Sequence, residues 1–181
     1  MILFFGPIGA GKSVQGQILA ARHGWRWLSA GQLLRDTHDP ELLKIMTTGE
    51  LVSETTTRAV MLDALKRAKD IKHVILDGFP RTLEQIKWLF AAEPDHERSV
   101  QLVVVLEVPQ SELLRRLQLR GRLDDNPEAI ANRMNLYRRE IYPILTYLTD
   151  KHVRIAHIDG TGSVGQVHDR IEAELEACSL V

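Results

Sequence analysis

The sequence predicts an α/β fold in which helices cover both faces of a parallel sheet. Four short apolar runs, at residues 1–5, 73–76, 100–108 and 152–158, alternate along the chain with segments of helical length. This alternation is typical of parallel strands joined by crossover helices. The run from Leu102 to Leu106 is apolar at every position, as in a strand that is covered on both faces. A chain of 181 residues has room for one such domain.

Segments between and after these runs have the length and pattern of helices. They are residues 12–23, 41–47, 54–69, 82–92, 110–120, 127–149 and 164–177. The clearest start is Asn126-Pro127-Glu128, because Asn suits the N-cap, Pro the first turn, and Glu the positive end of the helix dipole.

The composition excludes several classes of protein. Hydrophobic residues make up 44% of the chain, charged residues 26%, and the net charge is −1, as in an ordinary globular domain. No window approaches the roughly 18 uninterrupted apolar residues of a membrane helix. The single cysteine, Cys178, allows no internal disulfide. We therefore expect a cytoplasmic monomer that binds neither nucleic acid nor a membrane.

The first apolar run is followed by a phosphate-binding loop. Residues 6–13 read GPIGAGKS and match GxxxxGK[ST] between a strand and a helix. The glycines let successive backbone N–H groups point into one concavity, the helix N-terminus adds positive charge, and Lys12 reaches the outer phosphates. This motif predicts a P-loop NTPase fold.

A second motif, DGFPR at residues 77–81, ends the run at 73–76. Together with the phosphate loop and LSAGQLLR at 28–35, it closely resembles the adenylate kinase family of nucleoside monophosphate kinases, from Met1 to the final helix. The resemblance implies a five-stranded parallel sheet in one domain over residues 1–181. It also implies a small insert at about 29–52 that binds the monophosphate, and a very short lid at about 121–125.

The implied activity is transfer of the γ-phosphoryl group of ATP to AMP, giving two ADP, with Mg²⁺ as cofactor. The resemblance assigns ATP binding to Gly9, Ala10, Gly11, Lys12, Ser13, Val14, Arg116, Arg120 and Gly162. It assigns Mg²⁺ binding to Ser13 and Asp77, the carboxylate acting through water.

The acceptor side is assigned in the same way. The residues implied in monophosphate binding are Ala30, Arg35, Glu50, Leu51, Val52, Gly78, Phe79, Pro80, Arg81, Gln85, Arg122 and Arg133. The catalytic set implied is Lys12, Arg81, Arg122 and Arg133.

Two departures from the family pattern affect the acceptor and the lid. Ala30 replaces a threonine common near the adenine of AMP, and Ser-Ala-Gly at this place resembles UMP/CMP kinases. Gln85 falls where adenylate kinases carry the glutamine that reads adenine, and an amide can donate and accept at once. AMP is therefore the preferred acceptor, with UMP or CMP as the alternative. Between Arg120 and Asp124 lie three residues, a lid shorter than the family's short form.

Two further alternatives come from the chemistry. A phosphate acceptor is largely ionised at neutral pH because its second pKa is about 6, so its kinase needs positioning and positive charge rather than a base. A P-loop kinase of a small-molecule hydroxyl would use a base, and Asp77 could serve. A non-catalytic nucleotide-binding module has no need of transition-state arginines, so the arginines of this chain argue against it.

Overall fold

The computed structural model of the protein describes residues 1–121 and 125–181. Its elements are, in chain order, β1 (Ile2–Phe5), α1 (Lys12–His23), β2 (Arg26–Ser29), α2 (Ala30–Asp36), α3 (Pro40–Thr48), α4 (Glu54–Arg67), β3 (Val74–Asp77), α5 (Leu83–Ala91), α6 (Glu93–His96), β4 (Leu102–Glu107), α7 (Gln110–Arg120), α8 (Pro127–Asp150), β5 (Arg154–Asp159) and α9 (Val164–Ala177).

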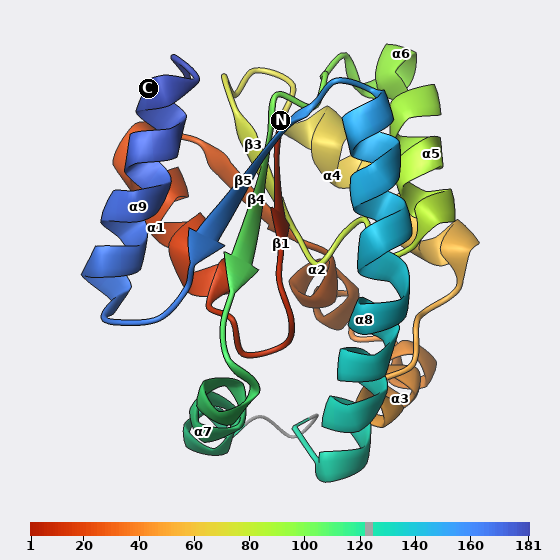
Figure 1. Cartoon of the computed structure of the whole chain (residues 1–181). Helices are drawn as coiled ribbons and strands as arrows, with labels where there is room; N and C mark the ends of the chain where they lie inside the picture. The colour runs from red at the N-terminus through yellow and green to blue at the C-terminus, as the bar shows by residue number, and fades with distance from the viewer. Residues whose placement is uncertain (122–124) are drawn as a thin grey trace.

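The five strands form one parallel sheet in the order β2-β3-β1-β4-β5. The predicted α/β fold with a five-stranded parallel sheet is therefore confirmed. Helices α1 and α9 lie on one side of the sheet, and α4, α5 and α8 lie on the other (Figure 1). Because β1 lies between β3 and β4, the segment after β1 leaves from the centre of the sheet edge.

The core consists of two apolar layers, one on each face of the sheet. In β4, Val103 and Val105 pack toward α4, α5 and α8, whereas Val104 and Leu106 pack toward α1 and α9. The prediction that this apolar run is covered on both faces is confirmed. In the described part of the chain, no helix has both the length and the apolar composition needed to cross a membrane.

The seven predicted helices and four predicted strands are present with ends within two residues of those expected. The sequence patterns missed β2, α2 and α6. Strand β2 has four residues, of which only Leu28 and Ser29 are buried, so it lacks the apolar run that marks the inner strands. Helices α2 and α6 are too short, at seven and four residues, to develop a helical periodicity.

The sheet brings the two sequence motifs together. Phe4 of β1 pairs with Asp77 of β3, so the phosphate loop and the segment 77–81 leave neighbouring strands at one edge. The carboxyl edge of a parallel sheet, where neighbouring connections diverge, is where ligands bind in such folds. Helices α3 and α7 and the first turns of α8 lie beyond this edge (Figure 1).

Candidate active site

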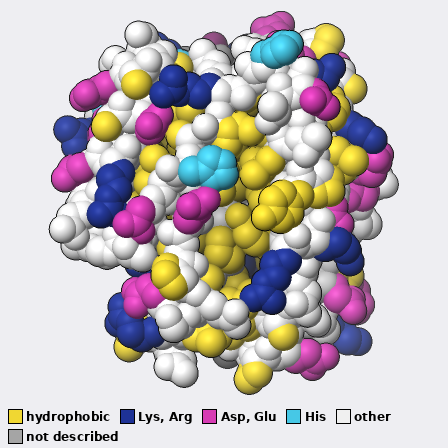
Figure 2. Space-filling model, in the orientation of Figure 1, with side chains coloured by type: hydrophobic (Ala, Val, Ile, Leu, Met, Phe, Trp, Pro, Cys, Tyr) yellow, Lys and Arg dark blue, Asp and Glu magenta, His cyan; other side chains and the backbone are white. Residues whose placement is uncertain are grey.

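A cleft of about 600 Å³ opens at the carboxyl edge of the sheet. In the space-filling view, hydrophobic side chains gather at the centre of the face, and Lys and Arg side chains lie around them (Figure 2). The predicted site residues that the structure describes all line this cleft, with the exception of Phe79. Phe79 is 1% exposed and packs edge-on against Trp88 in the core. Arg122 lies outside the described residues.

The phosphate loop wraps around the start of α1. Gly6 has φ +145°, and a Cβ there would lie 2.9 Å from the carbonyl oxygen of Leu106, so this turn requires glycine. Lys12 Nζ donates hydrogen bonds to the carbonyl oxygens of Gly6, at 2.7 Å, and Pro7, at 2.9 Å. These bonds hold the ammonium over the loop, where phosphate oxygens could replace the two carbonyls.

Charge and burial alter the acidity of this lysine. Burial is the main cause that lowers the pKa of the Lys12 ammonium to about 8, because the charged form loses hydration. Asp77 opposes this shift, and the positive charges of Arg81 and Arg120 add to it. An anion bound in the cleft would raise the pKa again.

Ser13 and Asp77 form an oxygen-rich pair beside the loop. The Ser13 hydroxyl donates to Asp77 Oδ2 at 2.6 Å, and Asp77, the last residue of β3, is 3% exposed. No three His, Cys, Asp or Glu side chains of the described residues gather into a metal site. A hydroxyl and one carboxylate fit Mg²⁺, which keeps several waters and takes its other ligands from phosphates.

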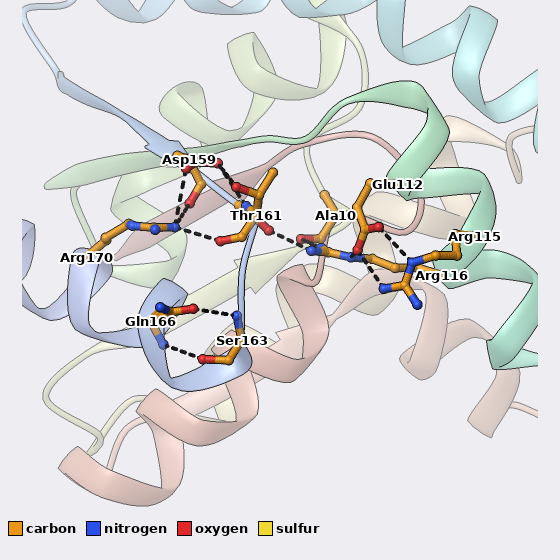
Figure 3. Close-up of polar contacts among 10 residues, drawn as sticks. Ala10, Glu112, Arg115, Arg116, Asp159, Thr161, Ser163, Gln166 and Arg170 are labelled. Carbon is orange, nitrogen blue, oxygen red and sulfur yellow. Dashed lines mark hydrogen bonds and ion pairs between the residues drawn. The ribbon is translucent and has the colours of Figure 1, made fainter.

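Arg116 of α7 joins two segments that are distant in sequence. Its guanidinium donates to the carbonyl oxygens of Ala10, at 3.4 Å, and Gly160, at 2.9 Å. Its Nε donates to Glu112 at 2.8 Å (Figure 3). Glu112 also accepts two hydrogen bonds from Arg115, and the bonds from Arg115 and Arg116 lower the pKa of its carboxyl to about 2. Glu112 therefore stays ionised and orients Arg116 between the phosphate loop and the start of the β5–α9 connection.

Arg120 and Arg133 converge on the carboxylate of Asp125. Arg120 donates to both oxygens of Asp125, with Nε at 2.7 Å from Oδ2, and the Asp125 side chain is 3% exposed. Arg133 Nη1 lies 3.9 Å from the same carboxylate, and its Nη2 donates to the carbonyl oxygen of Met46 in α3 at 2.8 Å. The two arginines thus already face a negatively charged group, the carboxylate of Asp125, so their position also suits the oxygens of a phosphate chain.

The part of the cleft where the monophosphate is expected to bind is formed by α2, by the segment between α3 and α4, and by Asp77, Gly78, Pro80, Arg81 and Gln85. Arg35 Nη2 donates to Gln32 at 3.2 Å, and Arg81 Nε donates to the carbonyl oxygen of Gly78 at 2.7 Å. Gln85 is 1% exposed, accepts from the backbone N–H of Arg81 at 2.7 Å and donates to Glu54 at 3.1 Å.

Among the residues in and around this site that were not found from the sequence are Glu54, Glu112 and Tyr137. Glu54 touches Gln85, Glu112 orients Arg116, and Tyr137 of α8 lines the cleft. Burial is the main cause that raises the pKa of Tyr137 to about 12. Glu112 and Tyr137 each lie four residues from a predicted arginine on the same helix, and this spacing could have identified them. Nothing in the local sequence links Glu54 to Gln85.

Comparisons with known proteins agree with this geometry. A sequence profile of the adenylate kinase family matches residues 4–153. An adenylate kinase of Synechococcus sp. (strain WH7803) is 37% identical over 180 residues, covering 96% of this chain and 97% of the relative. Adenylate kinases of Thermus thermophilus, 36% identical with 96% of each chain covered, and of Mycolicibacterium paratuberculosis, 35% identical with 93% and 95% covered, are similar in the same way. With its phosphate loop, its parallel sheet and these relatives, the chain belongs to the adenylate kinase family.

Proposed function

We propose that the protein is a phosphotransferase that moves the γ-phosphoryl group of ATP to AMP and releases two ADP. The observation that supports the proposal most directly is a single cleft that contains the phosphate loop, the arginines Arg35 and Arg81, and the buried amide of Gln85. Family membership supports the same reaction. The phosphate loop supplies the donor half, and Arg35, Arg81 and Gln85 supply the acceptor half.

In the donor half, the backbone of Gly9, Ala10, Gly11, Ser13 and Val14 cradles the phosphates of ATP. Lys12 lies against the phosphoryl group that moves, and Gly162 and Arg116 flank the nucleotide. Arg120 exchanges Asp125 for phosphate oxygens, because carboxylate and phosphate both present paired oxygens to a guanidinium. Ser13, and Asp77 through water, would hold Mg²⁺, which when bound would offset the charge of the phosphate chain.

In the acceptor half, the arginines Arg35 and Arg81 bind the phosphate of AMP. The base lies among Ala30, Glu50, Leu51, Val52, Gly78, Pro80 and Gln85, and Phe79 supports this wall from the core. Arg122 and Arg133 close on the phosphoryl group in transfer. Since AMP carries its negative charge already, no residue has to remove a proton, and alignment with charge stabilisation lowers the barrier.

Within one domain, the insert at 29–52 binds the monophosphate, and most of the short lid expected at 121–125 lies outside the described residues. We expect a monomer in the cytoplasm. A UMP/CMP kinase is the second candidate, because buried Ala30 lines the cleft where adenylate kinases carry a threonine. A hydroxyl kinase has less support, because Asp77 already accepts a hydrogen bond from Ser13 beside the phosphate loop.

The test is a coupled assay of ADP formation from ATP and Mg²⁺ with AMP, UMP, CMP or GMP as acceptor. Lys12→Met protein and a reaction without acceptor serve as controls. We expect the highest kcat/KM with AMP. A higher kcat/KM with UMP or CMP would show that this nucleotide, rather than AMP, is the preferred acceptor. The absence of turnover with every monophosphate would refute the proposed function.

A further inference from the structure

The side chain of Gln85 is held on both sides by groups from separate segments. Its Oε1 accepts from the backbone N–H of Arg81 at 2.7 Å, and its Nε2 donates to Glu54 Oε1 at 3.1 Å. Thr82 Oγ1 donates to the same carboxylate oxygen at 3.3 Å. Glu54 opens α4 and lies 31 residues before Gln85, so this contact exists only in the folded chain.

These two partners permit one orientation of the amide. A half-turn about the last side-chain bond would place Nε2 against the N–H of Arg81, donor against donor. The same half-turn would place Oε1 against the Glu54 carboxylate, acceptor against acceptor. Because Gln85 is 1% exposed, water cannot compensate either mismatch, and buried unpaired groups are costly. The N–H of Arg81 and the carboxylate of Glu54 therefore together select the orientation of the amide, and Glu54 supplies one of the two mismatches that disfavour its reversal.

The carboxylate of Glu54 is held in turn by an ion pair with Arg58. Arg58 Nε lies 3.3 Å from Glu54 Oε2, and its guanidinium lies over the Trp88 ring at 5.9 Å and donates to the carbonyl oxygen of Glu84 at 3.4 Å. The Glu54–Arg58 pair is partly exposed, so it contributes little to stability. Its effect is to keep the carboxylate at the N-terminus of α5, next to the cleft.

We propose that Glu54 is a positioning residue that sets the base selectivity of the acceptor site through the Gln85 amide. This inference rests on the proposed function. Arg81 uses one lone pair of the Gln85 carbonyl oxygen, and Glu54 uses one of its two N–H groups. The amide therefore retains one N–H and one carbonyl lone pair. In adenine, the unprotonated ring nitrogen can accept a hydrogen bond from this N–H, and the neighbouring amino group can donate one to this lone pair. In an oxo base the protonated ring nitrogen donates and the oxo group accepts, so the donor and the acceptor exchange places.

IMP is the probe for this inference, because it differs from AMP in having an oxo group and a ring N–H at that edge. The measurement is the ratio of the Kd of IMP to that of AMP, by calorimetric titration, together with kcat and KM for AMP and ATP. Glu54→Gln should lower the ratio about fivefold, the equivalent of one hydrogen bond of about 1 kcal/mol, because an amide at position 54 can donate or accept and so removes one of the two mismatches of the reversed Gln85 amide. The KM for ATP should stay unchanged.

The matched control is Glu84→Gln, which removes another first-turn carboxylate, that of α5, which accepts a hydrogen bond from Lys87. It should leave the ratio unchanged. The double variant with Gln85→Ala separates the roles, since Glu54→Gln should have no further effect on the ratio once the amide is gone. If Glu54→Gln does not fold, Glu54→Asp withdraws the carboxylate by one methylene and tests the same contact.

Three outcomes are distinguishable. A lower ratio that disappears in the Gln85→Ala background supports the positioning role. An unchanged ratio, or an equal effect with and without Gln85, overturns it while leaving AMP phosphorylation intact. If the unmutated protein binds no AMP, the proposed function itself is wrong, and this inference falls with it.

Discussion

Lys12→Met removes the ammonium over the phosphate loop and keeps a side chain of similar length. If the ammonium stabilises charge on the phosphoryl group in transfer, its loss should lower kcat by about 10² to 10³, comparable to removing one oxyanion donor. The KM for AMP should change little, because the Lys12 ammonium contacts the loop carbonyls of Gly6 and Pro7 rather than the acceptor half.

The same substitution should not unfold the protein. A pKa lowered from 10.5 to about 8 means that folding destabilises the charged form of Lys12 by about 3 kcal/mol. Met has no charge to desolvate, and in the open cleft water replaces the ammonium at the carbonyls of Gly6 and Pro7. The free energy of unfolding at pH 7 should therefore stay unchanged or rise by up to about 3 kcal/mol.

The assays are ADP formation under saturating ATP and Mg²⁺, and denaturant unfolding followed by circular dichroism. Lys12→Arg is the matched control, because it keeps the positive charge but changes the length and shape of the side chain. Activity within about threefold of the unmutated protein would remove Lys12 from the mechanism. A large loss of stability would show instead that the ammonium holds the loop together.

Four further predictions concern pH, the acceptor base and the lid. Because the pKa of Lys12 is about 8 in the free protein and phosphate raises it, the Kd of ATP should be flat below pH 8 and rise about tenfold per pH unit above it; titration from pH 7 to 9.5 measures this, and Lys12→Met should abolish the slope. Gln85→Ala should raise the KM of AMP about fivefold or more while the KM of ATP stays the same. Gly121→Pro should lower kcat, because Gly121 has φ +61° and proline requires a φ near −65°. If the lid is as short as the sequence predicts, phosphate should be released from ATP without acceptor at a rate above that of an adenylate kinase with a full-length lid.

Each of these has an outcome that contradicts it. A Kd of ATP that stays constant up to pH 9.5 would mean that Lys12 does not pair with phosphate. An equal rise of both KM values in Gln85→Ala would indicate general damage to the cleft. Gly121→Asn, which tolerates the left-handed conformation, should retain activity and thus isolate the backbone effect. Equal or slower phosphate release would mean that something other than the lid excludes water.

The sequence alone determined the features that depend on neighbouring residues. The phosphate loop could be read directly, because its glycines, Lys12 and Ser13 are contiguous and their geometry is local. The start of α8 followed from Asn126 and Pro127, and the Asn126 side chain does accept from the N–H of Ala129. The both-face burial of β4 followed from five consecutive apolar residues.

The tertiary structure decided which distant groups meet and how their acidity changes. Strand β2 exists because β3 supplies its hydrogen-bond partners, which no pattern within Arg26–Ser29 reveals. Glu54 reaches Gln85 across 31 residues, and Arg116 reaches Ala10 across 106. The pKa of Lys12 depends on burial and on the charges of three residues from two other segments. Such contacts depend on how the helices pack around the sheet, and that packing is the sum of many weak interactions along the whole chain.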